Sequence, residues 1–159
     1  VYDQIPGASN PDNEFMNKVK AWVELCTKSP STLAQADSEE EKIEEFLGKS
    51  AGAIAVERHC GKIADVYTPL GRMHTQEGKD LMEVPTIIGI GGVVRNSRHP
   101  KQILSGALYD FMTPESTKPK NPKFYLDKKY IFASMGLLSM IDADLAFELL
   151  DKETIEINE

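Results

Sequence analysis

An apolar run meets three glycines in Thr86-Ile87-Ile88-Gly89-Ile90-Gly91-Gly92-Val93-Val94-Arg95-Asn96-Ser97-Arg98-His99-Pro100, and a helix is expected to follow. Glycine has no side chain and reaches positive φ at little cost, so the backbone can come close to a ligand there. A strand that ends in Gly-x-Gly-Gly ahead of a helix can present bare amides to a nucleotide. The same glycines also suit a tight turn in an α/β domain, and so short a motif leaves both interpretations open.

Two helices and a strand are predicted on the N-terminal side of this segment. The first helix is expected to start at Asn10 and Pro11, and a longer one follows the capping box Ser38-x-x-Glu41 and ends at Gly61. Along the longer helix the small residues predict one closely packed face; they are Gly48, Gly52 and Ala55. A strand is predicted for residues 62–68, a polar loop for 72–83, and a second strand after Pro85.

The C-terminal side is predicted to be helical. A helix should begin near Pro100 and turn its apolar side chains inward, namely Ile103, Leu104, Ala107, Leu108 and Phe111. A connector rich in Pro and Lys covers residues 112–123. Asp127 is then expected to cap a helix bearing Tyr130, Ile131, Ser134, Leu137 and Leu138, and Asp142 to cap a last helix through Leu150.

Composition narrows the class of protein. The 159 residues are 41% hydrophobic, which is enough apolar material for a core. The formal net charge of -7 repels a phosphate backbone, so nucleic acid is not expected as a partner. No apolar run approaches the roughly 20 residues that span a bilayer, so no membrane association is expected and the predicted location is the cytoplasm.

The chain opens on Val1-Tyr2-Asp3, without an initiator Met, which suggests a piece of a longer polypeptide. Its two cysteines, Cys26 and Cys60, lack C-x-x-C spacing and are interpreted as reduced structural thiols.

Four motifs occur in a distinctive order: residues 55–61, residues 76–81, the glycine segment and residues 126–138. They read Ala-Val-Glu-Arg-His-Cys-Gly, Gln-Glu-Gly-Lys-Asp-Leu, Ile-Gly-Ile-Gly-Gly, and Leu-Asp-Lys-Lys-Tyr-Ile with Gly136-Leu137-Leu138. Together the motifs resemble the MutL-like accessory proteins of adenosylcobalamin-dependent glutamate mutase, and the similarity spans about residues 40 to 150. These proteins share only their name with an unrelated mismatch-repair protein.

The resemblance implies a partial lobe of the actin-like ATPase (ribonuclease H-like) fold, an α/β sheet flanked by helices. Two lobes clasp ATP or ADP with Mg²⁺ in that fold, and this chain would be the C-terminal portion. Residues 1–37 would end a preceding subdomain as a helical segment and linker, and residues 38–159 would form the C-terminal lobe. The implied nucleotide-binding residues are Gly89, Gly91, Gly92, Val93 and Arg95.

One position departs from the family's pattern. The resemblance leads us to expect Thr between the first two glycines, whereas this chain has Ile90. If that hydroxyl touches the nucleotide in relatives, affinity here falls, since a net hydrogen bond is worth roughly 1 kcal/mol.

Lys79 and Asp80 are the remaining candidates for chemistry. They offer a cation for phosphate and a carboxylate for Mg²⁺, and Gly78 gives the loop freedom to bring both toward the glycine segment. The alternative is that both are solvated loop charges, or that Asp80 caps local backbone amides.

Other sites have less support in the sequence. Arg58 and His59 suit the C-terminal end of a helix dipole. Zinc binding would need Cys26, Cys60, His59, His74 and His99, whose spacing is not that of zinc ligands, so no metal site is predicted. The basic residues around the connector either form a docking surface or are ordinary solvated charges; they are Lys118, Lys120, Lys123, Lys128 and Lys129.

Three functions compete. The first is part of an ATP-dependent, chaperone-like accessory or reactivating protein for a cobalamin-dependent mutase, with the mutase subunit and a nucleotide as partners. Any ATPase activity would then belong to the full-length protein, and we expect the fragment alone to be inactive. The second is a non-enzymatic interaction module whose nucleotide site has decayed, which Ile90 favours. The third is a small-molecule kinase lobe, although no acid stands out as a general base.

Overall fold

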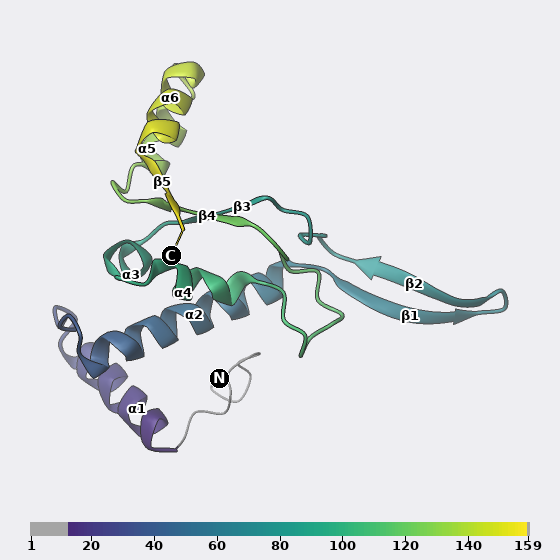
Figure 1. Ribbon diagram of the computed structural model, residues 1–159, viewed down its shortest axis with the longest axis horizontal. Coiled ribbons are helices and arrows are strands. Elements are labelled where there is room, and N and C mark those ends of the chain that lie inside the picture. The colour runs from purple at the N-terminus through teal and green to yellow at the C-terminus, as the bar shows by residue number, and fades with distance from the viewer. Residues whose placement is uncertain (1–12, 159) are drawn as a thin grey trace.

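A computed structural model of the chain describes residues 13–158 and has a mixed α/β fold, as predicted. A long helix runs through the middle of the molecule, a β-hairpin projects from one of its ends, and a small sheet lies beside it (Figure 1). The helices are α1 (Asn13–Lys28), α2 (Glu39–His59), α3 (Gly92–Asn96), α4 (Pro100–Leu104), the 3₁₀ turn η2 (Ser105–Ala107), α5 (Phe132–Leu138) and α6 (Ala143–Glu153). The strands are β1 (Lys62–Thr68), β2 (Gly71–Glu77), β3 (Thr86–Gly89), β4 (Lys123–Asp127) and β5 (Thr154–Ile157).

Helix α2 starts and ends for local reasons. Its N-cap Ser38 accepts a hydrogen bond from the Glu41 amide, which confirms one half of the predicted capping box; the Glu41 carboxylate accepts from the Asp37 amide rather than from that of Ser38. Acidic residues occupy the first turn. Arg58 and His59 lie in its last turn, where the helix dipole favours positive charge. The helix stops before Gly61, as expected, but the φ of Gly61 is not in the left-handed region. Gly61 is instead needed for space, because a Cβ there would lie 2.5 Å from the Glu77 carbonyl oxygen.

The first half of α2 packs against α1. Val19, Trp22 and Ile43 are buried where the two helices meet, and Phe15 and Phe46 pack edge to face with ring centroids 5.3 Å apart. The predicted start of α1 at Asn10 and Pro11 lies outside the described residues. The division of the chain at residues 37 and 38 stays a prediction.

The three-stranded sheet is centred on β4. Strand β3 pairs with β4 in parallel, with Ile87 opposite Phe124, and β5 pairs with it antiparallel, with Leu126 opposite Ile155. Phe124 and Leu126 are buried. The connection from β3 to β4 passes through α3, α4 and η2, as a parallel pair requires.

Helix α2 comes close to this connection at one small residue. A Cβ on Gly48 would lie 3.0 Å from Val93 Cγ1 and 3.2 Å from Ile103 Cγ2, which confirms close packing at this position. At Gly52, by contrast, a Cβ would meet nothing within 4 Å. The closely packed face therefore covers only the stretch of α2 around Gly48.

The structure corrects several sequence-based predictions. Residues 71–77 form strand β2 rather than a loop, and pair with β1 along its whole length. Strand β4 follows the connector directly, so the helix after Asp127 begins only at Phe132. The C-terminal part is not purely helical, because β5 follows α6. Phe111 is 88% exposed rather than inward, because the helix from Pro100 gives way to a 3₁₀ turn.

Of the two predicted aspartate caps, only the one at Asp142 is confirmed. The N-cap of α5 is Ile131, without a side-chain cap hydrogen bond, and Asp127 is the last residue of β4. The Asp127 carboxylate accepts from the amides of Ile131 and Phe132, although Tyr130 lies before α5 with a φ of 61° rather than inside it. The Asp142 carboxylate accepts from the Leu145 amide at the start of α6. A short polar side chain can thus be matched to a helix start from sequence even where the neighbouring strands are missed.

Candidate functional site

The glycine turn, residues 89–92, joins the end of β3 to α3. Gly91 has φ 102° and ψ 157°, a backbone conformation that other residues rarely adopt. Its carbonyl accepts from the Arg95 amide at 2.9 Å and so begins the helix. The helix thus starts at Gly92, and a second helix starts at Pro100 where the sequence predicted one.

The other two glycines serve different purposes. Gly89 is buried, and a Cβ there would lie 2.8 Å from Val94 Cγ1 and 3.0 Å from Leu104 Cδ1. It therefore lets the helices approach the end of the strand. Gly92 is exposed, and a Cβ there would meet only Asn96 Nδ2, at 3.9 Å. A side chain at 92 would enter open space beside the turn.

A pocket of about 600 Å³ opens beside Gly92, within the size range of small-molecule sites. One wall is the carboxylate face of α2, the opposite wall is α3, and the loop before α2 closes one side. The lining residues are Leu33, Ala34, Glu41, Glu44, Glu45, Gly92, Val93, Asn96, Ser97 and Ile103. Its charged groups are all acidic.

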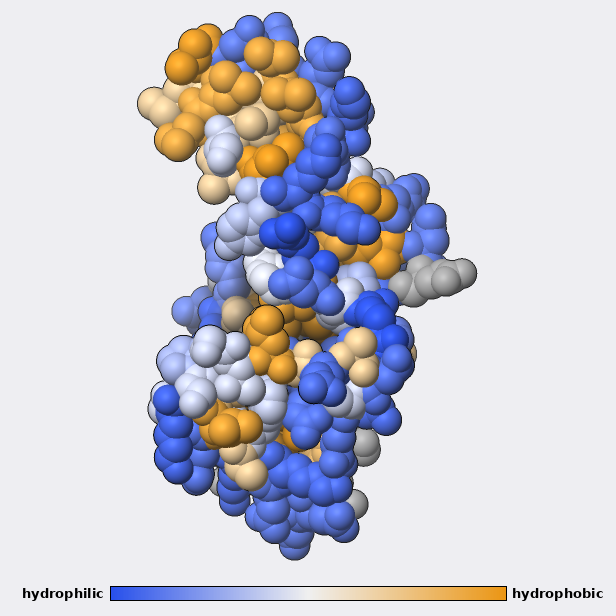
Figure 2. All heavy atoms as spheres, turned by 90° about the vertical axis from the view of Figure 1, so that its left-hand side faces the viewer, coloured by the Kyte–Doolittle hydropathy of each residue, from blue (hydrophilic) through white to orange (hydrophobic). Residues whose placement is uncertain are grey.

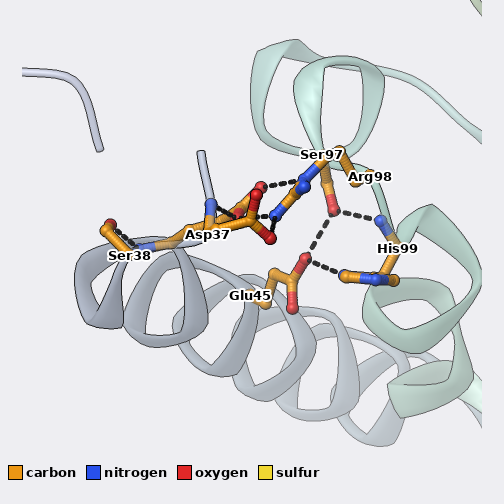
Figure 3. Close-up of polar contacts among 7 residues, drawn as sticks. Asp37, Ser38, Glu45, Ser97, Arg98 and His99 are labelled. Carbon is orange, nitrogen blue, oxygen red and sulfur yellow. Dashed lines mark hydrogen bonds and ion pairs between the residues drawn. The ribbon is translucent and has the colours of Figure 1, made fainter. Parts of the chain in front are cut away.

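A set of polar contacts, here called the polar clamp, ties α2 to the segment after α3 (Figure 3). The Arg98 guanidinium donates to Asp37 at 2.6 Å and to Glu41 at 2.7 Å. Glu45 accepts from Ser97 Oγ and lies 2.9 Å from His99 Nδ1. Hydrogen bonds from Arg98 hold the pKa of both Asp37 and Glu41 below their ordinary values. The clamp is formed by Asp37, Glu41, Glu45, Ser97, Arg98 and His99.

The clamp leaves two pocket groups unused. Within residues 13–158, the side chains of Glu44 on α2 and Asn96 on α3 have no hydrogen-bond or ion-pair partner. They line the same pocket, so a carboxylate acceptor and an amide are available to one ligand. Such a pair suits a ligand that carries hydroxyl or amino donors, while three carboxylates oppose an anionic group.

The predicted nucleotide residues are only partly brought together. Gly92 and Val93 line the pocket, and Gly89 and Gly91 shape the turn behind it. Arg95 is exposed in the last turn of α3 and is not a lining residue. Ile90, where the family resemblance led us to expect Thr, is 55% exposed. The binding role of these residues stays a prediction.

Lys79 and Asp80 lie at the other end of α2. Lys79 Nζ is 3.2 Å from His59 Nε2, whereas Val93 packs near Gly48. Gly48 and His59 are eleven positions apart, which corresponds to roughly 16 Å along the helix axis. The Asp80 carboxylate accepts from the Met82 amide, the local capping that was the alternative interpretation. The structure does not bring this pair to the pocket, and its phosphate role stays a prediction.

A buried polar cluster, here called the hairpin root, lies at the base of the hairpin, and no sequence motif predicted it. Lys118 is only 1% exposed, and its Nζ pairs with Glu57 Oε2 at 3.0 Å. Ser116 Oγ donates to the same oxygen, and Thr117 Oγ1 lies 2.9 Å from the carbonyl oxygens of Gly61 and Lys79. Lys118 is therefore not part of a basic docking surface. The root consists of Glu57, Cys60, Gly61, Ser116, Thr117 and Lys118.

The structure also shows the state of the two cysteines, whether side chains are grouped to hold a metal ion, and whether a helix could cross a membrane. Both cysteines are free, and Cys60 Sγ lies 3.2 Å from Ser116 Oγ. Over residues 13–158, no group of three or more His, Cys, Asp and Glu side chains is arranged to hold a metal ion. Within the same range, every helix is too short or too polar to cross a bilayer.

The fold and site thus define an α/β protein with a glycine turn beside an acidic pocket. The family model described as MutL protein matches residues 7–154, and the chain belongs to this family. A relative described as Protein MutL, from Clostridium tetanomorphum, is 37% identical over 138 residues, which is 85% of this chain. The chain spans about 30% of the length of that curated relative. No solved structure matches the chain.

Proposed function

We propose that this chain supplies part of the nucleotide site of a MutL accessory protein that serves a cobalamin-dependent mutase such as glutamate mutase. Membership of the MutL family supports the accessory role. The observation that supports the nucleotide site is the pocket beside Gly92, in whose walls Glu44 and Asn96 have no partner among the described residues. We further propose that the surrounding sheet and helices are a lobe of an actin-like ATPase.

In this proposal, the negative charge of the pocket determines which end of the nucleotide enters it. Three carboxylates would repel phosphates, so the purine and ribose enter the pocket and the phosphates with Mg²⁺ lie outside it. The Glu44 carboxylate accepts hydrogen bonds from ribose hydroxyls, and Val93 and Ile103 offer apolar contact to the base. Nucleotide turnover in the whole protein then changes the angle between lobes and so the affinity for the mutase subunit.

Calorimetric titration of the complete gene product with ATP and ADP tests the nucleotide site. Gly92→Val places a branched side chain in the pocket, and we expect Kd to rise at least tenfold, which is about 1.4 kcal/mol. Gly52→Ala is the matched control, because a Cβ there meets nothing within 4 Å. No binding of either nucleotide by the unsubstituted protein would remove the proposed site.

A second candidate is a non-enzymatic interaction module. The exposed Ile90 favours it, since an apolar side chain at the turn offers no hydrogen bond to a nucleotide. Capture of purified glutamate mutase with and without ATP separates the two functions. Nucleotide-dependent capture supports the ATP-dependent accessory protein, and capture that ATP does not change supports the module.

A further inference from the structure

The helical pair α5 and α6 carries an exposed apolar surface at one end of the molecule (Figure 2). Leu137 is 70% exposed, Met140 83%, Ile141 87% and Phe147 70%. In the described part of the chain, α5 has no buried residue and α6 has only Ala146. We define the α5–α6 face as Phe132, Leu137, Met140, Ile141, Leu145 and Phe147.

The pair α1 and α2 shows what a covered helix pair looks like in this chain. Val19 is fully buried there, and Trp22 and Ile43 are less than 10% exposed. A short helix depends for most of its stability on burying an apolar face, and α5 has only seven residues. An isolated α5–α6 pair with its large side chains in water lacks that stabilisation, and a patch of this kind marks an interface.

The face belongs to the family's own sequence. The MutL family model extends to residue 154 and so includes all of α5 and α6. The curated relative is about three times as long as the matched region, so most of a MutL polypeptide of that length lies outside this chain. Four exposed acidic residues lie at the start of α6 or within it, and their charge opposes docking on an anionic membrane; they are Asp142, Asp144, Glu148 and Asp151.

We propose that the α5–α6 face is an internal interface, covered by the part of the MutL polypeptide that this chain does not include. The partner surface is apolar and belongs to the same complete polypeptide, so the interface forms on folding and does not depend on protein concentration. The proposal is independent of the nucleotide site, because the pocket lies between α2 and α3 and shares no residue with this face.

Photo-crosslinking in the complete gene product identifies what covers the face. A benzophenone amino acid replaces Phe147, and the same probe at Glu148, its exposed polar neighbour on α6, is the control. We expect probe 147 to crosslink within one polypeptide to residues outside 1–159, and the control to do so far less. Crosslinks between two copies, or equal yields from both positions, would overturn the proposal.

Thermal unfolding of the same complete protein gives a second measurement. Ile141→Asp buries a carboxylate in the proposed interface, and we expect Tm to fall by about 4 °C or more. Leu70→Asp is the matched control, because Leu70 is 95% exposed at the turn between β1 and β2. Equal, small changes in Tm for the two variants would show that Ile141 stays in water and would contradict an internal interface.

Discussion

A charged cluster lies at each end of α2, and the two clusters differ in how far their charged side chains are exposed to water. At the start of the helix, the polar clamp is partly open to water: the side chains of Asp37 and Arg98 are 82% and 44% exposed, although that of Glu41 is only 17% exposed. At its other end, in the hairpin root, the side chains of Glu57 and Lys118 are 17% and 1% exposed. The clamp borders a pocket, whereas the polar groups of the root bond to one another. One helix thus supports a site at one end and an anchor at the other.

This difference in burial decides what each cluster does. An exposed ion pair contributes little to stability, because water already solvates both charges. A buried pair also contributes little in net terms, but breaking it leaves a charge in a poorly solvated place. We therefore expect the root to control whether the hairpin stays attached, and the clamp to control the shape of the pocket wall.

The largest expected effect is at Lys118. Lys118→Ala removes the main partner of Glu57, and we expect the free energy of unfolding to fall by about 3 kcal/mol. Lys62, 3.4 Å from the other Glu57 oxygen, limits the loss. The control is the double variant Lys118→Met with Glu57→Gln, which removes both charges and should lose less than Lys118→Ala. Urea denaturation of the unsubstituted protein and the two variants measures the free energy of unfolding. A loss below 1 kcal/mol for Lys118→Ala would mean that the ion pair of the root contributes as little as the ion pairs of the clamp.

Gly61 provides a purely steric test of the root. Gly61→Ala places a Cβ 2.5 Å from the Glu77 carbonyl oxygen and 2.9 Å from Gly78 C, both of them backbone atoms. We expect a loss of roughly 2 kcal/mol, in the range for overpacking. Gly52→Ala has open space in the middle of α2 and should instead gain up to about 1 kcal/mol from helix propensity. Denaturation curves for the two variants should therefore shift in opposite directions.

The pH dependence of stability also distinguishes the two ends of α2, and here we expect an effect of intermediate size on the free energy of unfolding. Burial alone raises the pKa of Glu57, but hydrogen bonds from Lys118 and Ser116 outweigh it and hold the pKa below its ordinary value. A lowered pKa in the folded state stabilises the fold above the unfolded value, about 4.3, and this contribution is lost as pH falls through the folded value.

We expect Glu57→Gln to flatten the acid loss of stability more than Glu41→Gln does. Both carboxylates are 17% exposed, but Lys118, the partner of Glu57, is 1% exposed, whereas Arg98, the partner of Glu41, is 44% exposed. Urea denaturation of both variants from about pH 7 down to about pH 3 makes the comparison. An equal change in the two profiles would show that burial of the cationic partner does not decide the contribution of the carboxylate.

The sequence predicted the features that depend on near neighbours. The N-cap at Ser38, the cap at Asp142 and the strand ahead of Gly89 each follow from residues a few positions apart. It missed β2, whose residues 71–77 are all exposed and lack the apolar alternation that marks a strand. Strand β4 was hidden because Lys-rich residues precede it and Asp127 reads as a helix cap.

The two charged clusters could not be predicted because they join distant residues. Lys118 reads as a surface lysine until the fold places it against Glu57, 61 positions earlier in the chain. In the clamp, Glu41 was recognised as half of a capping box, but its ion pair with Arg98 spans 57 positions. The pocket follows from the same contact, since the segment after α3 reaches α2 through Arg98 and His99.

The smallest expected effect on stability is at Arg98. Arg98→Ala removes exposed ion pairs with Asp37 and Glu41, and we expect a loss of no more than about 1 kcal/mol that shrinks as salt is added. Arg98→Lys, which keeps the charge but not the two-pronged geometry, should lose part of this amount. A loss above 2 kcal/mol that salt leaves unchanged would show that the clamp is an anchor like the root. A small loss in stability combined with a larger loss in nucleotide affinity would instead mean that Arg98 acts by holding the α2 wall of the pocket in place.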